Sequence, residues 1–98
     1  MFRVVYEWRV PVDKMDEFQT VWRSATDSIH HSVDGALGSF MLRSYETPEK
    51  VLTIAKWETH QDWEAFWKNR NPEKMQKMRD IAERISVEAF DEVEDRTK

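Results

Sequence analysis

The chain has 98 residues, of which 40% are hydrophobic and 12% aromatic, enough for one small globular domain with a single core. Fifteen lysines and arginines against nineteen aspartates and glutamates give a net charge of -4 without a basic stripe, so we expect no nucleic-acid partner. The absence of cysteine excludes disulfides, thiolate catalysis and cysteine-ligated metal sites, and it suits a reducing cytoplasm.

The first ten residues, MFRVVYEWRV, have the alternating pattern of a β-strand. Apolar side chains recur at every second position, at Phe2, Val4, Tyr6, Trp8 and Val10. Arg3 and Glu7 interrupt any continuous apolar run, so we expect neither a signal peptide nor a membrane span.

A long amphipathic helix is predicted after this strand. Asp13 is placed to cap its first turn, and the helix runs to a pair of histidines, His30 and His31. Its apolar residues recur at helical spacing, at Phe18, Val21, Trp22, Ala25 and Ile29. We interpret Trp22, like Trp8 in the strand, as a core residue, and the two histidines as surface residues near the helix C-terminus.

The next segment contains the only two glycines of the chain, Gly35 and Gly38, and leads into a second predicted strand at about residues 39–45. A turn at residues 46–49 separates it from a third strand at residues 51–57. Both faces of the third strand are apolar, which indicates a central position in the sheet.

The third strand ends at Trp57, and Thr59 with Asp62 then has the spacing of a capping box, which predicts the start of a second helix. Three large aromatic residues share one side of this helix: Trp63, Phe66 and Trp67. Bulky aromatics on a strand end and on the adjoining helix form either a corner of the core or the wall of a flat pocket.

Asn71 followed by Pro72 predicts a third helix, because proline is favourable at the first helical position. Its expected buried stripe consists of Met75, Met78, Ala82 and Ile85. A final strand is predicted near residues 87–93, followed by a polar tail at residues 94–98 that we expect to fray.

The predicted order of elements is that of an α+β fold, a ferredoxin-like βαββα(α)β sandwich with an antiparallel four-stranded sheet, in a single domain at residues 1–93. In this topology the helices cover one face of the sheet, yet the third strand is apolar on both faces. A small domain also leaves much of its surface unburied. We therefore expect a homodimer that pairs the two open faces.

The stretch DGALGSFMLRSYETPEKVLTIAKW at residues 34–57, together with ETHQDWEAFW, resembles the antibiotic biosynthesis monooxygenase (ABM) family. The most specific features are the Gly-x-x-Gly passage at Gly35 and Gly38, the run at residues 42–44, and Trp-Glu-Thr at residues 57–59. The resemblance implies a dimeric α/β barrel whose subunits each hold a cavity between sheet and helices. It also implies, for some members, oxidation of phenolic polyketides by oxygen without metal, flavin or haem.

Those members line the site with a tryptophan, an asparagine and a tyrosine. Trp57 matches the tryptophan, Thr53 stands in place of the asparagine, and Trp63 replaces the tyrosine. The resulting hypothesis is a cofactor-independent monooxygenase that oxidises a small aromatic or quinone-like substrate. The Trp57 indole would hydrogen-bond a substrate oxygen with Thr53 beside it, and His60 would act as the base. The expected substrate-binding residues are Trp63, Phe66, Trp67, Met75 and Met78.

Two alternatives remain open. The first is a dimeric ligand-binding or stress-associated protein that holds a small aromatic molecule without converting it. The second is the haem-degrading branch of the same superfamily, whose asparagine, tryptophan and axial histidine fall near Trp8, at Trp67 and at Lys77. Because adjacent histidines on a helix point apart, His30 and His31 make a poor metal clamp, and we predict neither a metal nor another cofactor.

Overall fold

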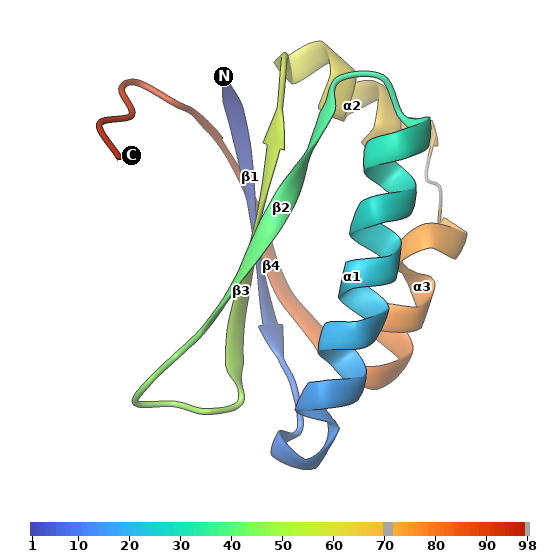
Figure 1. The fold of residues 1–98 in the computed structure, drawn as a ribbon, viewed down its shortest axis with the longest axis vertical. Helices are drawn as coiled ribbons and strands as arrows, with labels where there is room; N and C mark the ends of the chain where they lie inside the picture. The colour runs from blue at the N-terminus through green and yellow to red at the C-terminus, as the bar shows by residue number, and fades with distance from the viewer. Residues whose placement is uncertain (70–71, 98) are drawn as a thin grey trace.

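A four-stranded antiparallel sheet carries the helices on one of its faces in the computed structural model of the chain, which describes residues 1–69 and 72–97 (Figure 1). The elements follow in the order β1 (Phe2–Arg9), the 3-10 turn η1 (Val12–Lys14), α1 (Met15–Ser32), β2 (Ala36–Arg43), β3 (Lys50–Trp57), α2 (His60–Asn69), α3 (Pro72–Ile81) and β4 (Glu83–Asp91). The predicted α+β, ferredoxin-like fold is confirmed. Asn71, which with Pro72 predicted the start of α3, lies outside the described residues.

The strand order is β2-β3-β1-β4, so β3 is an inner strand, as its two apolar faces predicted. The alternation in β1 places Val4, Tyr6 and Trp8 on the helix side, where each is at most 5% exposed. Trp8 contacts Phe18 of α1 with ring centroids 5.4 Å apart, and both side chains are fully buried. The core therefore lies between the two inner strands and α1.

The junction between β3 and α2 is fixed by the predicted cap. The Asp62 backbone N–H donates to Thr59 Oγ1 at 3.1 Å, and the Thr59 hydroxyl donates to Asp62 Oδ2 at 2.9 Å. Gly35 packs against this cap with a φ of +82°, and a Cβ there would overlap the Asp62 carboxylate. The Glu58 N–H also donates to the Gly35 carbonyl at 2.9 Å. Glycine at this position thus lets the α1–β2 connection meet the start of α2.

Several predicted boundaries are wrong. Asp13 does not cap α1, because it lies in η1 and α1 begins two residues later without a side-chain cap. Strand β2 begins at Ala36, and β4 begins at Glu83, so Ile85 belongs to β4 and is 44% exposed instead of filling the α3 stripe. A register shift opposite the Glu7/Trp8 step of β1 breaks the alternation of β4 and hides it from a periodicity search.

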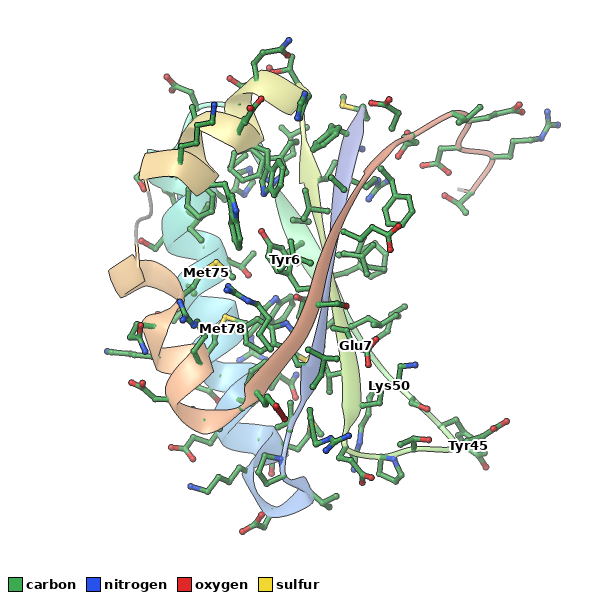
Figure 2. All side chains as sticks on the ribbon, turned by 180° about the vertical axis from the view of Figure 1, so that it is seen from behind. Tyr6, Glu7, Tyr45, Lys50, Met75 and Met78 are labelled. Carbon is green, nitrogen blue, oxygen red and sulfur yellow. The ribbon has the colours of Figure 1, made fainter. Side chains whose placement is uncertain are left out.

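The outer face of the sheet carries exposed apolar side chains. Phe40 and Leu42 of β2 are 45% and 47% exposed, and Phe90 of β4 is 44% exposed. Tyr6 and Glu7, adjacent on β1, point to opposite faces, with Tyr6 toward α3 and Glu7 away from it (Figure 2). The helices leave this outer face open.

After β4 the chain leaves the sheet (Figure 1) and is tied back near the start of β1. Glu92 donates its backbone N–H to the Met1 carbonyl at 2.9 Å, and its carboxylate pairs with Arg3 at 2.6 Å. Arg3 also approaches Asp95 at 3.7 Å. None of the helices in the described part of the chain has the length and apolar character needed to cross a membrane.

Candidate functional site

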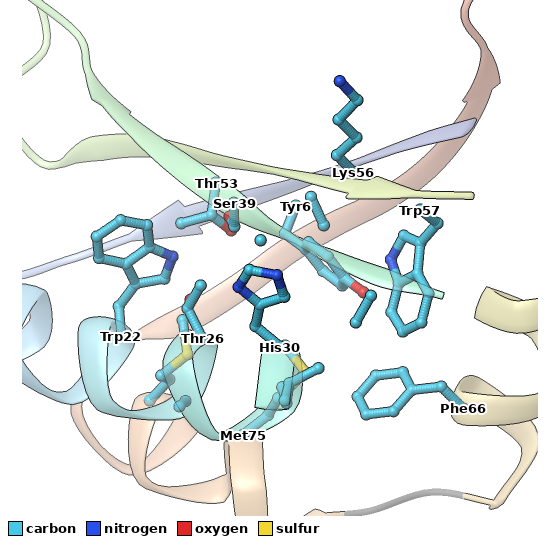
Figure 3. A pocket seen from close by; sticks show the side chains of 16 residues that line it. Tyr6, Trp22, Thr26, His30, Ser39, Thr53, Lys56, Trp57, Phe66 and Met75 are labelled. Atoms are coloured by element: carbon cyan, nitrogen blue, oxygen red, sulfur yellow. The ribbon is translucent and has the colours of Figure 1, made fainter. Parts of the chain in front are cut away.

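A cavity lies between the inner face of the sheet and helices α1, α2 and α3 (Figure 3). The empty space between its walls is about 510 Å³ including the open mouth, and about 50 Å³ of it admits the centre of a water molecule. Its lining residues are Tyr6, Trp22, Ala25, Thr26, Ile29, His30, Ala36, Gly38, Ser39, Thr53, Ala55, Lys56, Trp57, Phe66, Met75 and Met78. The lining is mainly apolar with a few polar groups, which is the composition typical of small-molecule sites.

Strand β3 supplies the two residues that the resemblance emphasised. Thr53 and Trp57 are four residues apart on a strand, so both face the helices, and each is 3% exposed. Trp57 Nε1 is buried and finds no hydrogen-bond partner among the described residues. Its indole nitrogen points toward the cavity in Figure 3, beside Phe66 at a ring-centroid distance of 5.3 Å. A ligand oxygen there would satisfy an N–H group that is otherwise costly to bury.

The Thr53 hydroxyl is oriented by the core beneath it. Trp8 donates its indole N–H to Thr53 Oγ1 at 3.0 Å, and Trp8 is fully buried. Since this bond uses one acceptor site of the hydroxyl, the Thr53 proton remains to be donated toward the cavity. Thr53 therefore offers a ligand a hydrogen-bond donor.

Tyr6 adds a second hydroxyl to the same wall, because it pairs with Thr53 across the β1–β3 ladder. Its Oη accepts a hydrogen bond from Trp63 Nε1 at 3.3 Å. Burial raises the pKa of Tyr6, and the Trp63 hydrogen bond and the charge of Arg84 oppose the shift. Tyr6 therefore stays a neutral phenol at neutral pH and can donate its proton to a ligand oxygen.

Helix α1 contributes Trp22, Thr26 and His30, of which the sequence reasoning assigned Trp22 to the core and His30 to the surface. Trp22 is only partly buried, and its buried Nε1 has no partner within the described residues. His30 is exposed yet lines the cavity, so it stands at the mouth. The three residues follow one another at intervals of four, on a single helix face. That spacing, with two polar residues beside an apolar stripe, was a signal that could have located them.

The remaining predicted residues fall into two groups. Phe66, Met75 and Met78, which the sequence predicts to bind substrate, line the cavity. Trp63 and Trp67 stack on each other at 5.7 Å and lie behind Tyr6, outside the lining. Arg84 covers the Trp67 ring at 5.1 Å from its centroid.

His60 does not reach the cavity. It opens α2 with its side chain 53% exposed, 3.5 Å from the Glu64 carboxylate, and it is not among the lining residues. The structure therefore gives the expected base no path to a ligand in this cavity. Within the described ranges, no three histidine or carboxylate side chains gather as metal ligands would.

The model of the antibiotic biosynthesis monooxygenase family matches residues 1–78. The chain belongs to the ABM family. A comparison with curated proteins found no match.

Solved structures extend the likeness over the whole fold. An asparagine-to-alanine variant of SnoaB, a cofactor-independent oxygenase from Streptomyces nogalater, shares 16% identity over 99% of this chain and 97% of its own, with a TM-score of 0.76. The haem degrader MhuD from Mycobacterium tuberculosis, with two haems bound in its active site, shares 18% identity over 97% and 98%, with a TM-score of 0.78. A conserved protein from Methanosarcina mazei shares 15% over 91% and 89%, with a TM-score of 0.73. At these identities the likeness establishes the fold alone.

Proposed function

We propose that this ABM protein is a monooxygenase that oxidises a small aromatic or phenolic substrate with molecular oxygen and without a cofactor. The observation that carries the proposal is the unpartnered, buried indole N–H of Trp57, which faces a largely apolar cavity between sheet and helices. Membership of the ABM family and the fold shared with a cofactor-independent oxygenase support it.

In the proposed reaction the substrate itself reduces oxygen. Loss of a proton gives an electron-rich phenolate or carbanion, and Trp57 Nε1 donates a hydrogen bond to the oxygen atom that carries the negative charge. For a CH₂ group beside a phenolic ring, one atom of O₂ becomes the new carbonyl oxygen, and the other leaves as water with the two hydrogens of that carbon. The hydroxyl groups of Thr53 and Tyr6 orient the ring, and Phe66 packs against its face.

We further propose that the working form is a cytoplasmic homodimer that pairs the outer sheet faces. Phe40 pairs with Ile54 and Leu42 with Leu52 in the β2–β3 ladder, so these residues form one apolar patch on the outer face. Its exposed members would be buried by a second copy of the chain. The two sheets would then form the barrel typical of the family.

Oxygen uptake tests the proposed reaction. The wild-type protein, supplied with a panel of hydroxylated naphthalenes and anthrones in the presence of a chelator, should consume oxygen and form the oxidised ring. Trp57→Phe keeps an aromatic ring but removes the N–H, and we expect roughly 100- to 1,000-fold slower turnover, as for loss of one oxyanion donor. Absence of uptake across the panel, or equal rates for wild type and Trp57→Phe, would refute the proposal.

Binding without conversion is the second candidate. The observation that favours it is that only Trp57 keeps the residue found in the polyketide-oxidising members, while Thr53 and Trp63 replace their asparagine and tyrosine. Quenching of tryptophan fluorescence by a ligand, with no change in the ligand's absorbance and no oxygen loss, would identify a binding protein.

The residues present do not fit the haem-degrading alternative. Trp8 is fully buried and its N–H is bound by Thr53, while Lys77 is exposed on α3 and does not line the cavity. Trp67, which matches the tryptophan of that branch, also lies outside the lining.

A further inference from the structure

Two side chains of α1 reach the cavity and have no part in the reaction so far described. Trp22 and His30 are eight residues apart, two turns along one face of the helix. Both line the same cavity as Trp57. In Figure 3 the His30 ring lies between the two indoles.

Trp22 matches Trp57 in one property. These two indole nitrogens are the buried side-chain N or O atoms that have no hydrogen-bond partner in the described part of the chain. In Figure 3 each points inward, from opposite sides of the cavity. An N–H that is buried and unpaired costs stability, and a ligand with an oxygen atom at each of two edges would satisfy both.

His30 is in a position to exchange a proton both with a ligand in the cavity and with water outside it. It lines the cavity while its side chain remains exposed at the mouth. A Cβ on Gly38 of β2 would lie 3.9 Å from His30 Nδ1, at ordinary van der Waals distance.

The other lining groups do not suit proton removal. No carboxylate occurs among the cavity-lining residues that the structure describes. Tyr6 is held in its neutral form, because burial raises its pKa. The Lys56 side chain points away from the cavity in Figure 3. An imidazole is the side chain that most readily exchanges a proton near neutral pH.

We propose that His30 is the base that takes the hydroxyl proton of the substrate, and that Trp22 Nε1 donates a hydrogen bond to a second oxygen atom of the same molecule. The substrate O–H bond breaks, an N–H bond forms on the imidazole, and the electron pair stays on the phenolate oxygen. The imidazolium then releases the proton to water at the mouth. The inference rests on the proposed function, because it supplies the base that the oxidation of a phenol requires.

A binding experiment without oxygen tests the inference directly. The probe is 4-nitrophenol, which carries oxygen atoms at both ends of its ring and absorbs visible light only as the phenolate. It is added anaerobically to the wild-type protein in a buffer in which the free probe is mostly neutral. We expect the bound probe to show the phenolate band with wild type and to lose most of it with His30→Gln. His31→Gln is the matched control, because His31 is the adjacent histidine and does not line the cavity.

Trp22→Phe should weaken probe binding about tenfold without abolishing the phenolate band, because it removes a hydrogen bond and not the base. In turnover assays His30→Ala should be roughly 100-fold slower or more, and free imidazole should restore part of the rate through the open mouth. A merely structural role would not respond to imidazole.

The possible failures are distinguishable. The inference is overturned if the phenolate band persists in His30→Gln or if wild type shows no phenolate band. This holds whether or not the protein consumes oxygen. A band that depends on His30 in a protein that consumes no oxygen leaves the inference standing and refutes the oxygenase. Equal probe affinity of wild type and Trp22→Phe overturns the role of Trp22.

Discussion

Replacing Thr53 by valine should destabilise the protein although the two side chains have nearly the same shape. Thr53 is 3% exposed and Trp8 is fully buried, and the hydrogen bond from Trp8 Nε1 to Thr53 Oγ1 is 3.0 Å long. Valine fills the same space, so no cavity forms, but the Trp8 N–H loses its acceptor.

The expected cost follows from that lost acceptor. A buried donor left without a partner lowers the free energy of unfolding by about 1–3 kcal/mol. The new methyl group offsets little of this loss, because it replaces a hydroxyl of equal size. For a domain of this length each kcal/mol lowers the melting temperature by about 4–8 °C. Thr53→Ser keeps the hydroxyl and should lose only the packing of one methyl group, about 1 kcal/mol.

Urea unfolding of wild type, Thr53→Val, Trp8→Phe and the double variant measures the bond itself. The double-mutant cycle removes the volume change of Trp8→Phe, which is common to both backgrounds, and should leave a coupling energy of about 0.5–3 kcal/mol with unchanged denaturant dependence. Coupling close to zero would show that Thr53 is not held by Trp8, and the argument that its proton is free for a ligand would fail.

Three further predictions concern other parts of the molecule. Gly35→Ala should cost about 1–3 kcal/mol in urea unfolding, because the residue has a positive φ and the added methyl group would overlap Asp62; an unchanged midpoint would contradict the packing described for this junction. Burial raises the pKa of Tyr6 above its ordinary value of 10.0. The contribution of the neutral phenol to the free energy of unfolding is therefore complete below about pH 10, and it is lost as the pH rises through the folded-state pKa. In Tyr45→Phe, where Tyr6 is the one remaining tyrosine, the ultraviolet ionisation midpoint should lie above 10, and a midpoint at or below 10 would place Tyr6 in water. Leu42→Glu should turn the proposed dimer into folded monomers in sedimentation experiments, and a dimer that persists would contradict the proposed interface.

The sequence was most informative where one pattern decides one feature. The strict alternation of β1 predicted its buried face, and Thr59 with Asp62 predicted the cap of α2, because both signals are local. It was least informative at β4, where the pairing with β1 shifts register and the alternation is lost. Periodicity alone cannot detect a bulge that the partner strand imposes.

The site divides in the same way. The position of Trp57 and Thr53 on the cavity wall could be predicted because the two residues lie on one face of one strand, and Trp57 matches the tryptophan of the family pattern. The sequence does not place Trp22 and His30 in the cavity lining. Whether this face of α1 meets the core or the cavity depends on the angle at which α1 crosses the sheet, and packing between distant segments sets that angle. His60 is close to Trp57 in sequence, but the turn into α2 carries it to the surface.

The most direct test of the central claim is a crystal structure of the protein with 1-naphthol bound. We predict that the ring lies between sheet and helices beside Phe66, with its oxygen about 2.7–3.2 Å from Trp57 Nε1. A cavity closed by the side chains of Trp22 and Met75, or a ligand bound only on the outer face of the sheet, would contradict the account.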